Sequence, residues 1–168
     1  MKLDGPGPYD WECNPNIGEL QLAYVPVTGE HVKITGIMHV LNMRINRFET
    51  FNAAASVGFE NSAILATGVL FQLQVMRAAQ DEIKFVLRGD GGQIDSKTLA
   101  SGPNKETDIP FLIKLDEGIV SVVAAPSSLA AKIGAVSNKP RRDLIQMVMT
   151  CSGAHVQFSK VSITSGAQ

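Results

Sequence analysis

The chain has 168 residues, of which 45% are apolar and 18% charged. It contains 15 basic and 16 acidic residues, which gives a net charge of −1. This composition is typical of one globular domain rather than of a disordered chain. The near balance of charge argues against a nucleic-acid partner, which normally requires an excess of Lys and Arg. No apolar run approaches the roughly 20 residues that span a bilayer, so no membrane insertion is expected.

The first 17 residues are rich in proline and glycine, which interrupt regular structure. We expect residues 1–17 to form an irregular N-terminal arm and residues 18–168 to form a single domain. Trp11 is expected to pin this arm to the body. The opening "MKLDGPGPYDWE" lacks the apolar core of a signal peptide, so the localisation is left open between cytoplasmic and secreted without a visible signal.

From Gly18 onward, short apolar runs alternate with turn sequences such as "PVTGE", "RGDGGQ" and "DEG". Side chains in "IKFVLR" and "FLIKLD" alternate with a period of two, which indicates half-buried strands. In "HVQFSKVSI" the alternation slips after Phe158, which predicts a β-bulge near Ser159–Lys160. The predicted strands cover residues 18–25, 32–45, 53–60, 63–77, 82–89, 109–115, 119–125, 143–151 and 155–164.

Helical character is confined to "SSLAAKIGA", residues 127–135, and to the start of "FETFNAAASV". Many short strands with little helix predict an all-β fold, an antiparallel two-sheet β-sandwich of the jelly-roll type. A closed β-barrel is the alternative. The segment Val32–Ile45 is apolar on both faces, which fits a central strand, a barrel wall or the interface of a homo-oligomer.

Several stretches resemble galectin-type lectins. "TGEHVKITGIMHVLNMRINRF" is similar to their early strands, "DIPFLIKLDEGIVSVVAA" to a later strand pair and "DLIQMVMTCSGAHVQFSKVSI" to the closing pair. The resemblance covers residues 25–164 in order and implies a concanavalin-like jelly roll. Such lectins bind galactosides through a His–Asn–Arg set, an Asn–Trp pair and a Glu–Arg pair. This chain has "NAAASVGFEN" and "VLFQLQVMR" there, so the galactose site is not carried over.

Polar residues on the outward faces of the predicted strands are the candidates for a ligand site. Amides and cations on rigid strands form directional hydrogen bonds with sugar hydroxyls, although a solvated sheet face carries the same residue types. His39 is either a partly buried, hydrogen-bonded histidine or a base in a pocket. The candidate ligand-binding residues are Gln72, Gln74, Arg77, Lys84, Arg88 and His39.

Signals for catalysis, metals and cofactors are weak. The three histidines are far apart in sequence, and the chain has neither a Glu-x-Asp-x-Glu run nor a phosphate-binding loop. No catalytic residue, metal or cofactor is therefore expected. Cys13 and Cys151 are expected to be two separate thiols, with a disulfide as the alternative.

The preferred function is a lectin-like, non-catalytic module that binds carbohydrate or another small-molecule ligand. One alternative is a carrier or enzyme that holds a small hydrophobic molecule inside a β-barrel. The other is a structural β-protein that associates with itself.

Overall fold

A computed structural model gives the structure of the protein. It describes residues 1–5, 7–27, 31–44, 53–61, 69–79, 82–89, 92–101, 107–116, 119–124, 127–132 and 145–166. Where these ranges include residues 60–72, 74–107, 117–121 and 125–145, the structure describes the backbone but not the side chains.

The described part of the chain is almost entirely β-strand, and it contains no helix long and apolar enough to cross a membrane. The strands are β1 (Tyr9–Cys13), β2 (Leu20–Pro26), β3 (His31–Met43), β4 (Ala54–Asn61), β5 (Val69–Ala79), β6 (Glu82–Gly89), β7 (Gly92–Ser101), β8 (Thr107–Asp116), β9 (Ile119–Ala124), β10 (Ser127–Lys132), β11 (Ile145–Ser152) and β12 (Ala154–Gly166).

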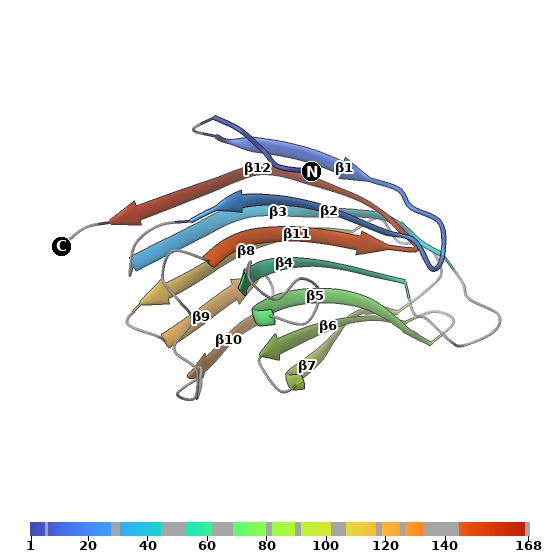
Figure 1. The fold of residues 1–168 in the computed structure, drawn as a ribbon. Helices are drawn as coiled ribbons and strands as arrows, with labels where there is room; N and C mark the ends of the chain where they lie inside the picture. Colours follow the sequence, from blue (N-terminus) through green and yellow to red (C-terminus); the bar gives the residue numbers. More distant parts are fainter. Residues whose placement is uncertain are drawn as a thin grey trace.

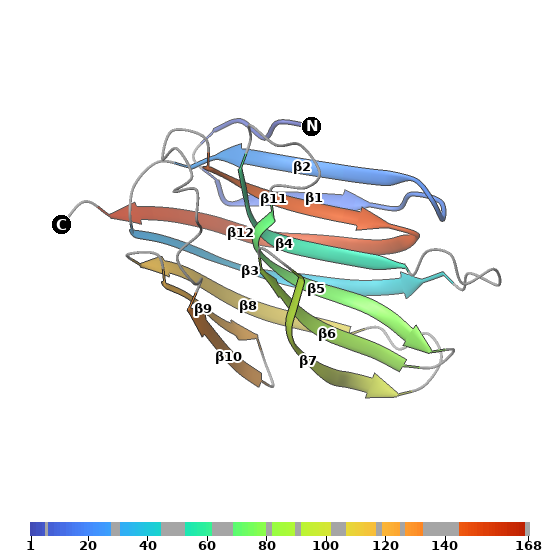
Figure 2. The same cartoon turned by 60° about the horizontal axis from the view of Figure 1, so that its bottom comes forward.

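The strands form two six-stranded sheets (Figure 1). Sheet A has the order β2-β11-β4-β5-β6-β7, and sheet B has the order β1-β12-β3-β8-β9-β10. All neighbouring strands pair antiparallel. Each sheet ends in two edge strands (Figure 2), so the predicted sandwich is confirmed and the closed barrel is wrong. The alternative of a carrier or enzyme with a pocket inside a barrel loses its structural basis.

The core lies between the two sheets and is built from every second residue of their strands. In sheet A, Ala23, Met149, Val57 and Leu73 are paired across four neighbouring strands, and each is fully buried. Side chains of directly paired residues point to the same face of a sheet. This row therefore defines the inner face of sheet A, and the alternate residues define its outer face.

Sheet B contributes a matching inner face, on which Ile34, Met38, Ile113 and Phe158 are fully buried. Gly36 belongs to this face because its neighbours two residues away, Ile34 and Met38, lie in the core. A Cβ atom at this position would lie 2.7 Å from Cζ of Phe111, the direct pairing partner of Gly36. The glycine therefore makes room for the Phe111 ring, which is 4% exposed.

The bulge predicted in the last strand is confirmed. The pairing of β12 with β3 shifts between Ser159 and Ser162, and Lys160 has a positive φ of 53°. The backbone N–H of Lys160 donates instead to Oδ1 of Asp10 at 2.8 Å. The extra residue returns Val161 to the inner face, where it is fully buried, as the slip in the sequence pattern requires.

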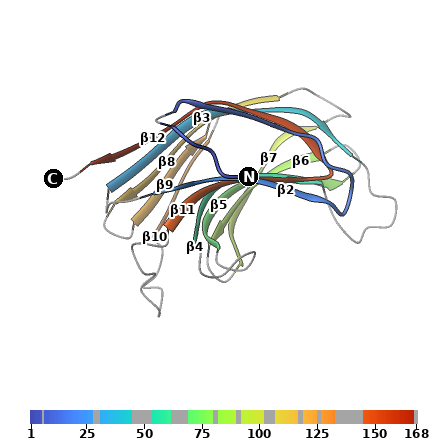
Figure 3. The same cartoon turned by 45° about the horizontal axis from the view of Figure 1, so that its top comes forward.

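The N-terminal segment is more regular than the expected irregular arm. Residues 9–13 form β1, which pairs with β12 at the edge of sheet B. The rings of Trp11 and Phe158 stack with their centroids 5.6 Å apart, so Trp11 pins this segment to the body as predicted. Leu3 donates its backbone N–H to the carbonyl of Tyr24 at 2.9 Å, which fastens the first residues to β2 of sheet A (Figure 3).

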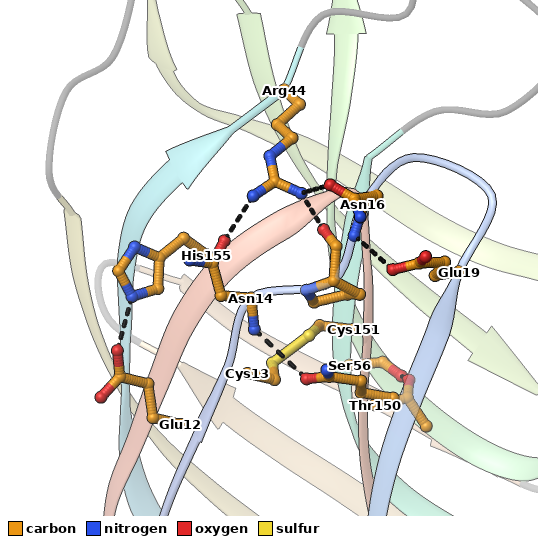
Figure 4. Close-up of a disulfide and its surroundings, with 12 residues drawn as sticks. Glu12, Cys13, Asn14, Asn16, Glu19, Arg44, Ser56, Thr150, Cys151 and His155 are labelled. Atoms are coloured by element: carbon orange, nitrogen blue, oxygen red, sulfur yellow. Dashed lines mark hydrogen bonds and ion pairs between the residues drawn. A yellow bond between two sulfur atoms is a disulfide. The ribbon is translucent and has the colours of Figure 1, made fainter.

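Cys13 and Cys151 form a disulfide, so the expectation of two separate thiols is wrong and the alternative is confirmed. Cys13 ends β1 of sheet B and Cys151 lies in β11 of sheet A, with their Cα atoms 6.4 Å apart (Figure 4). Both residues are almost fully buried. The bond therefore links the two layers of the sandwich through the core, across 138 positions of sequence.

Polar contacts of Arg44 secure the chain that follows β1 (Figure 4). Its guanidinium donates to Oδ1 of Asn14 at 2.6 Å and to the carbonyl oxygen of Pro15. The backbone N–H of Asn16 donates to Oε2 of Glu19 at 2.9 Å and holds the pKa of Glu19 below its ordinary value, with Arg44 adding a weaker effect. Any stabilisation from this carboxylate is present above its unfolded pKa and is lost as the pH falls through the lower folded value.

Two further segments differ from the sequence prediction. Residues 127–132, within the segment 127–135 expected to be helical, form strand β10, which pairs with β9 in unbroken register from Ser127 to Lys132. Residues 92–101, for which no strand was predicted, form β7 at the edge of sheet A. Both strands lie at the ends of their sheets, where one side of the strand has no neighbour.

Candidate functional site

Five of the six candidate ligand-binding residues, all except His39, lie on β5 and β6 of sheet A, which directs attention to the outer face of this sheet. This face consists of the residues that alternate along each strand with the buried core residues. Two rows of residues paired across neighbouring strands on this face are partly described. In the first, Leu22, Thr150 and Ser56 are direct pairing partners across β2, β11 and β4. In the second, Tyr24, Val148 and Gly58 are paired across the same strands.

The backbone register extends both rows into β5 and β6. Gln72 is paired with Gly58 on one side and with Arg88 on the other. Gln74 is paired with Ser56 on one side and with Val86 on the other. The side chains of Gln72, Gln74, Arg77, Lys84 and Arg88 are outside the described part of the structure, so their positions rest on this register alone.

The register places the three predicted basic residues on two different faces of the sheet: Lys84 and Arg88 on one, and Arg77 on the other. Lys84 pairs with Met76, which alternates in step with Gln72 and Gln74, so Lys84 falls on the same set of positions as Arg88. Arg77 pairs with Ile83 and instead alternates in step with the buried Leu73. The register shifts immediately after Arg77.

Gln146 is a residue of this face that the sequence analysis did not select. It alternates in step with Val148 and Thr150 on β11, away from the core side chains Met147 and Met149. The residue is 8% exposed, and its amide has no hydrogen-bond partner among the described residues. Its direct pairing partners are Pro26 on β2 and Glu60 on β4, and the side chain of Glu60 is outside the described part of the structure.

The centre of the outer face is formed by small side chains and one buried hydroxyl pair. On β4, every second residue is small: Ala54, Ser56 and Gly58. The hydroxyl groups of Ser56 and Thr150 lie 2.5 Å apart, and Ser56 is 2% exposed (Figure 4). Small residues in the middle of a sheet allow another group to approach the backbone closely.

His39 lies apart from the other candidates, on the outer face of sheet B. It is partly buried and hydrogen-bonded: its Nδ1 lies 2.6 Å from Oδ1 of Asp108 and its Nε2 lies 2.7 Å from Oγ of Ser159. The predicted residues are therefore not one constellation, since His39 belongs to β3 of the opposite sheet. No group of three or more metal-ligating residues occurs in the described part of the chain.

A shallow hollow of about 220 Å³ is also present on sheet B. Lys33 and Lys114, which are directly paired on β3 and β8, line it together with Thr164. The pair of His31 and Asp116, with Nδ1 and Oδ1 2.5 Å apart, also lines it. This hollow contains none of the residues predicted to bind a ligand.

The fold and its two open sheets place the protein in the class of concanavalin-like jelly-roll sandwiches, as the sequence resemblance implied. No family model matches the chain, and no curated protein matches its sequence.

Solved structures show the same fold at low sequence identity. The CBM2 module of the evolved Dit of Lactobacillus casei BL23 phage J-1 superposes with a TM-score of 0.58 at 9% identity, covering 91% of this chain and 74% of that one. The alginate lyase AlyA1 of Zobellia galactanivorans superposes with a TM-score of 0.56 at 14% identity, covering 86% of this chain. The match spans 65% of the length of that lyase. Caenorhabditis elegans galectin LEC-6 gives 0.49 at 9% identity, covering 92% and 95% of the two chains.

Proposed function

We propose that the protein is a lectin-like module that binds carbohydrate on the outer face of sheet A. The observation that carries this proposal is the amide of Gln146, which is buried on that face and lacks a partner among the described residues. A sugar hydroxyl is both a donor and an acceptor, so it matches either end of an amide.

The register supplies further polar groups on the same face, in the row next to that of Gln146. The row that contains Val148 and Gly58 continues through Gln72 to Arg88. Neighbouring strands lie about 4.8 Å apart, so these four positions span about 14 Å across the sheet. Gly58, which has no side chain, is the direct pairing partner of Gln72 on this face. Such a row suits an extended chain of sugars better than a single one.

The structural neighbours support the ligand class. Three of them with TM-scores above 0.5 are described as alginate lyases. We therefore expect a polysaccharide or oligosaccharide ligand, and alginate oligomers are the first to test. Fold analogy by itself does not assign the sugar.

Replacing Gln72 and Gln74 together with alanine is expected to weaken carbohydrate binding about 30-fold, since two neutral hydrogen bonds contribute about 1 kcal/mol each. The melting temperature should stay nearly unchanged if the two amides serve binding rather than packing. Binding is measured by isothermal titration calorimetry with the best ligand from a glycan array that includes alginate oligomers. Thermal unfolding is followed by circular dichroism.

Asn42→Ala is the matched control, because it removes an exposed amide from β3 in the opposite sheet. This variant should bind the same ligand with wild-type affinity. A drop of many degrees in the melting temperature of the double variant would assign the glutamines to the structure of the sheet. An array without any reproducible ligand for the wild-type protein would reject the lectin-like function itself.

A further inference from the structure

Three residues on the outer face of sheet B form a continuous chain of hydrogen bonds. Ser159 of β12, His39 of β3 and Asp108 of β8 come from three neighbouring strands. The Oγ atom of Ser159 lies 2.7 Å from Nε2 of His39, and Nδ1 of His39 lies 2.6 Å from Oδ1 of Asp108. The residues are separated by 120 and 69 positions of sequence, so the fold alone brings them together.

The direction of these hydrogen bonds follows from the chemistry of the groups. A carboxylate only accepts, so Nδ1 of the neutral His39 ring carries the proton and donates to Asp108. Nε2 then carries the lone pair and accepts the hydroxyl proton of Ser159. A serine that donates to a histidine held in one tautomer by a carboxylate is the arrangement of an activated nucleophile.

The backbone next to Ser159 is distorted at this point. The following residue, Lys160, has a φ of 53°, a conformation that residues with a side chain rarely adopt. It belongs to the bulge of β12, and bulges near active sites re-aim side chains. The register pairs Ser159 with Ile37, and pairs His39 with Gln157. The serine therefore reaches His39 diagonally across the strand pair.

A hydrogen-bond donor lies beside this serine. Gln157 is the direct pairing partner of His39, so it shares the outer face, and it is exposed. Its amide has no partner among the described residues, which leaves its N–H groups available to a developing oxyanion. The backbone N–H of Lys160 is not available for this role, because it donates to Asp10.

We propose that Ser159 and His39 are catalytic residues for the hydrolysis of carboxylic esters, with Asp108 as the positioning residue. The Oγ atom of Ser159 attacks the ester carbonyl carbon and its proton passes to Nε2 of His39. The bond from this carbon to the leaving alkoxide breaks, and the alkoxide departs with that proton. Water then attacks the acyl-serine, His39 returns the water proton to Oγ, and the carboxylic acid leaves. This activity does not depend on the carbohydrate-binding face, which belongs to the other sheet.

A fluorophosphonate probe tests the nucleophile directly, because the serine oxygen forms a bond to phosphorus as fluoride leaves. The wild-type chain is expected to be labelled on the peptide that contains Ser159, as located by mass spectrometry. Ser159→Ala should lose this adduct. Ser162→Ala, on the same strand and without a histidine contact among the described residues, should be labelled at the wild-type rate. Hydrolysis of p-nitrophenyl acetate should likewise be lost in Ser159→Ala and proceed at the wild-type rate in Ser162→Ala.

His39→Gln is expected to slow labelling about 100-fold or more, the contribution typical of a general base. Asp108→Asn should slow it as well, because an amide at this position favours the wrong tautomer of His39. Asp108→Glu should recover part of the rate, which a purely structural role of Asp108 would not produce. Circular dichroism confirms that each variant is folded. Equal labelling of wild-type and His39→Gln chains, or an adduct on another residue only, would overturn the proposal.

Discussion

Replacing Cys13 and Cys151 together with alanine is expected to lower the free energy of unfolding by about 5 kcal/mol. The disulfide closes a loop over 138 positions of sequence, and the chain-entropy model assigns a stabilisation of this size to so long a loop. For a domain of this length the loss corresponds to a decrease of about 10–20 °C in the melting temperature. Chemical denaturation of the wild-type and double-alanine chains measures the difference.

A reducing agent provides the control, because it should destabilise the wild-type chain and leave the double variant unchanged. A thiol reagent added to the denatured, unreduced wild-type chain should detect no free thiol. A free energy of unfolding within 1 kcal/mol of the wild type would show that the bond between β1 and β11 is not important for stability.

Phe158→Ala is expected to destabilise the protein by about 4 kcal/mol, the usual cost of removing a buried aromatic side chain. Phe158 is fully buried, and its ring stacks on Trp11 with 5.6 Å between centroids. The substitution therefore removes core packing in sheet B and the aromatic contact that holds β1. Denaturant unfolding measures the stability, and the fluorescence of Trp11, which is the single tryptophan, should shift toward that of a solvent-exposed indole.

Phe158→Leu is the matched control, since it keeps most of the apolar volume and removes only the ring contact. It should lose less than half of the stability lost in Phe158→Ala. If both variants unfold at the wild-type denaturant concentration, Phe158 does not contribute to the core as described. An unchanged Trp11 spectrum in the alanine variant would show that β1 does not depend on this stacking.

Most of the strands were predictable from the sequence because half-buried strands alternate apolar and polar residues. The strand β8 shows this most clearly: Ile109, Phe111 and Ile113 are buried, while Asp108 and Lys114 are exposed. The bulge at Lys160 was visible for the same reason, since a slip in the alternation must be absorbed by an extra residue. These features depend on local patterns that a single sequence contains.

The remaining strands depend on partners that are distant in sequence. The segment 92–101 has few apolar residues, and it becomes β7 by pairing with β6. The segment 127–132, which is rich in alanine, has helical propensity, but its register with β9 decides its structure. Tertiary pairing outweighs local propensity in such edge strands. The strand β1 was obscured by the prolines and glycines around it.

The sites depended even more on tertiary structure. The pairing of Cys13 with Cys151 and the contacts of His39 with Asp108 and Ser159 have no signal in residue spacing. Gln146 sits in the alternating run "LIQMVMT", a pattern that places its side chain away from the core but carries no signal of its burial. The binding role of Gln72 and Gln74 remains a prediction, supported by their register with Gly58 and Ser56.

Backbone amide chemical shifts, recorded while an oligosaccharide from the glycan array is added, test the carbohydrate-binding face most directly. We predict that the largest shift changes fall on β11, β4 and β5, with Gln146, Gly58 and Gln72 among them. Amides on the outer face of sheet B, such as those of Lys33 and Lys114, should not move. Shift changes confined to sheet B would contradict the assignment of the binding face to sheet A.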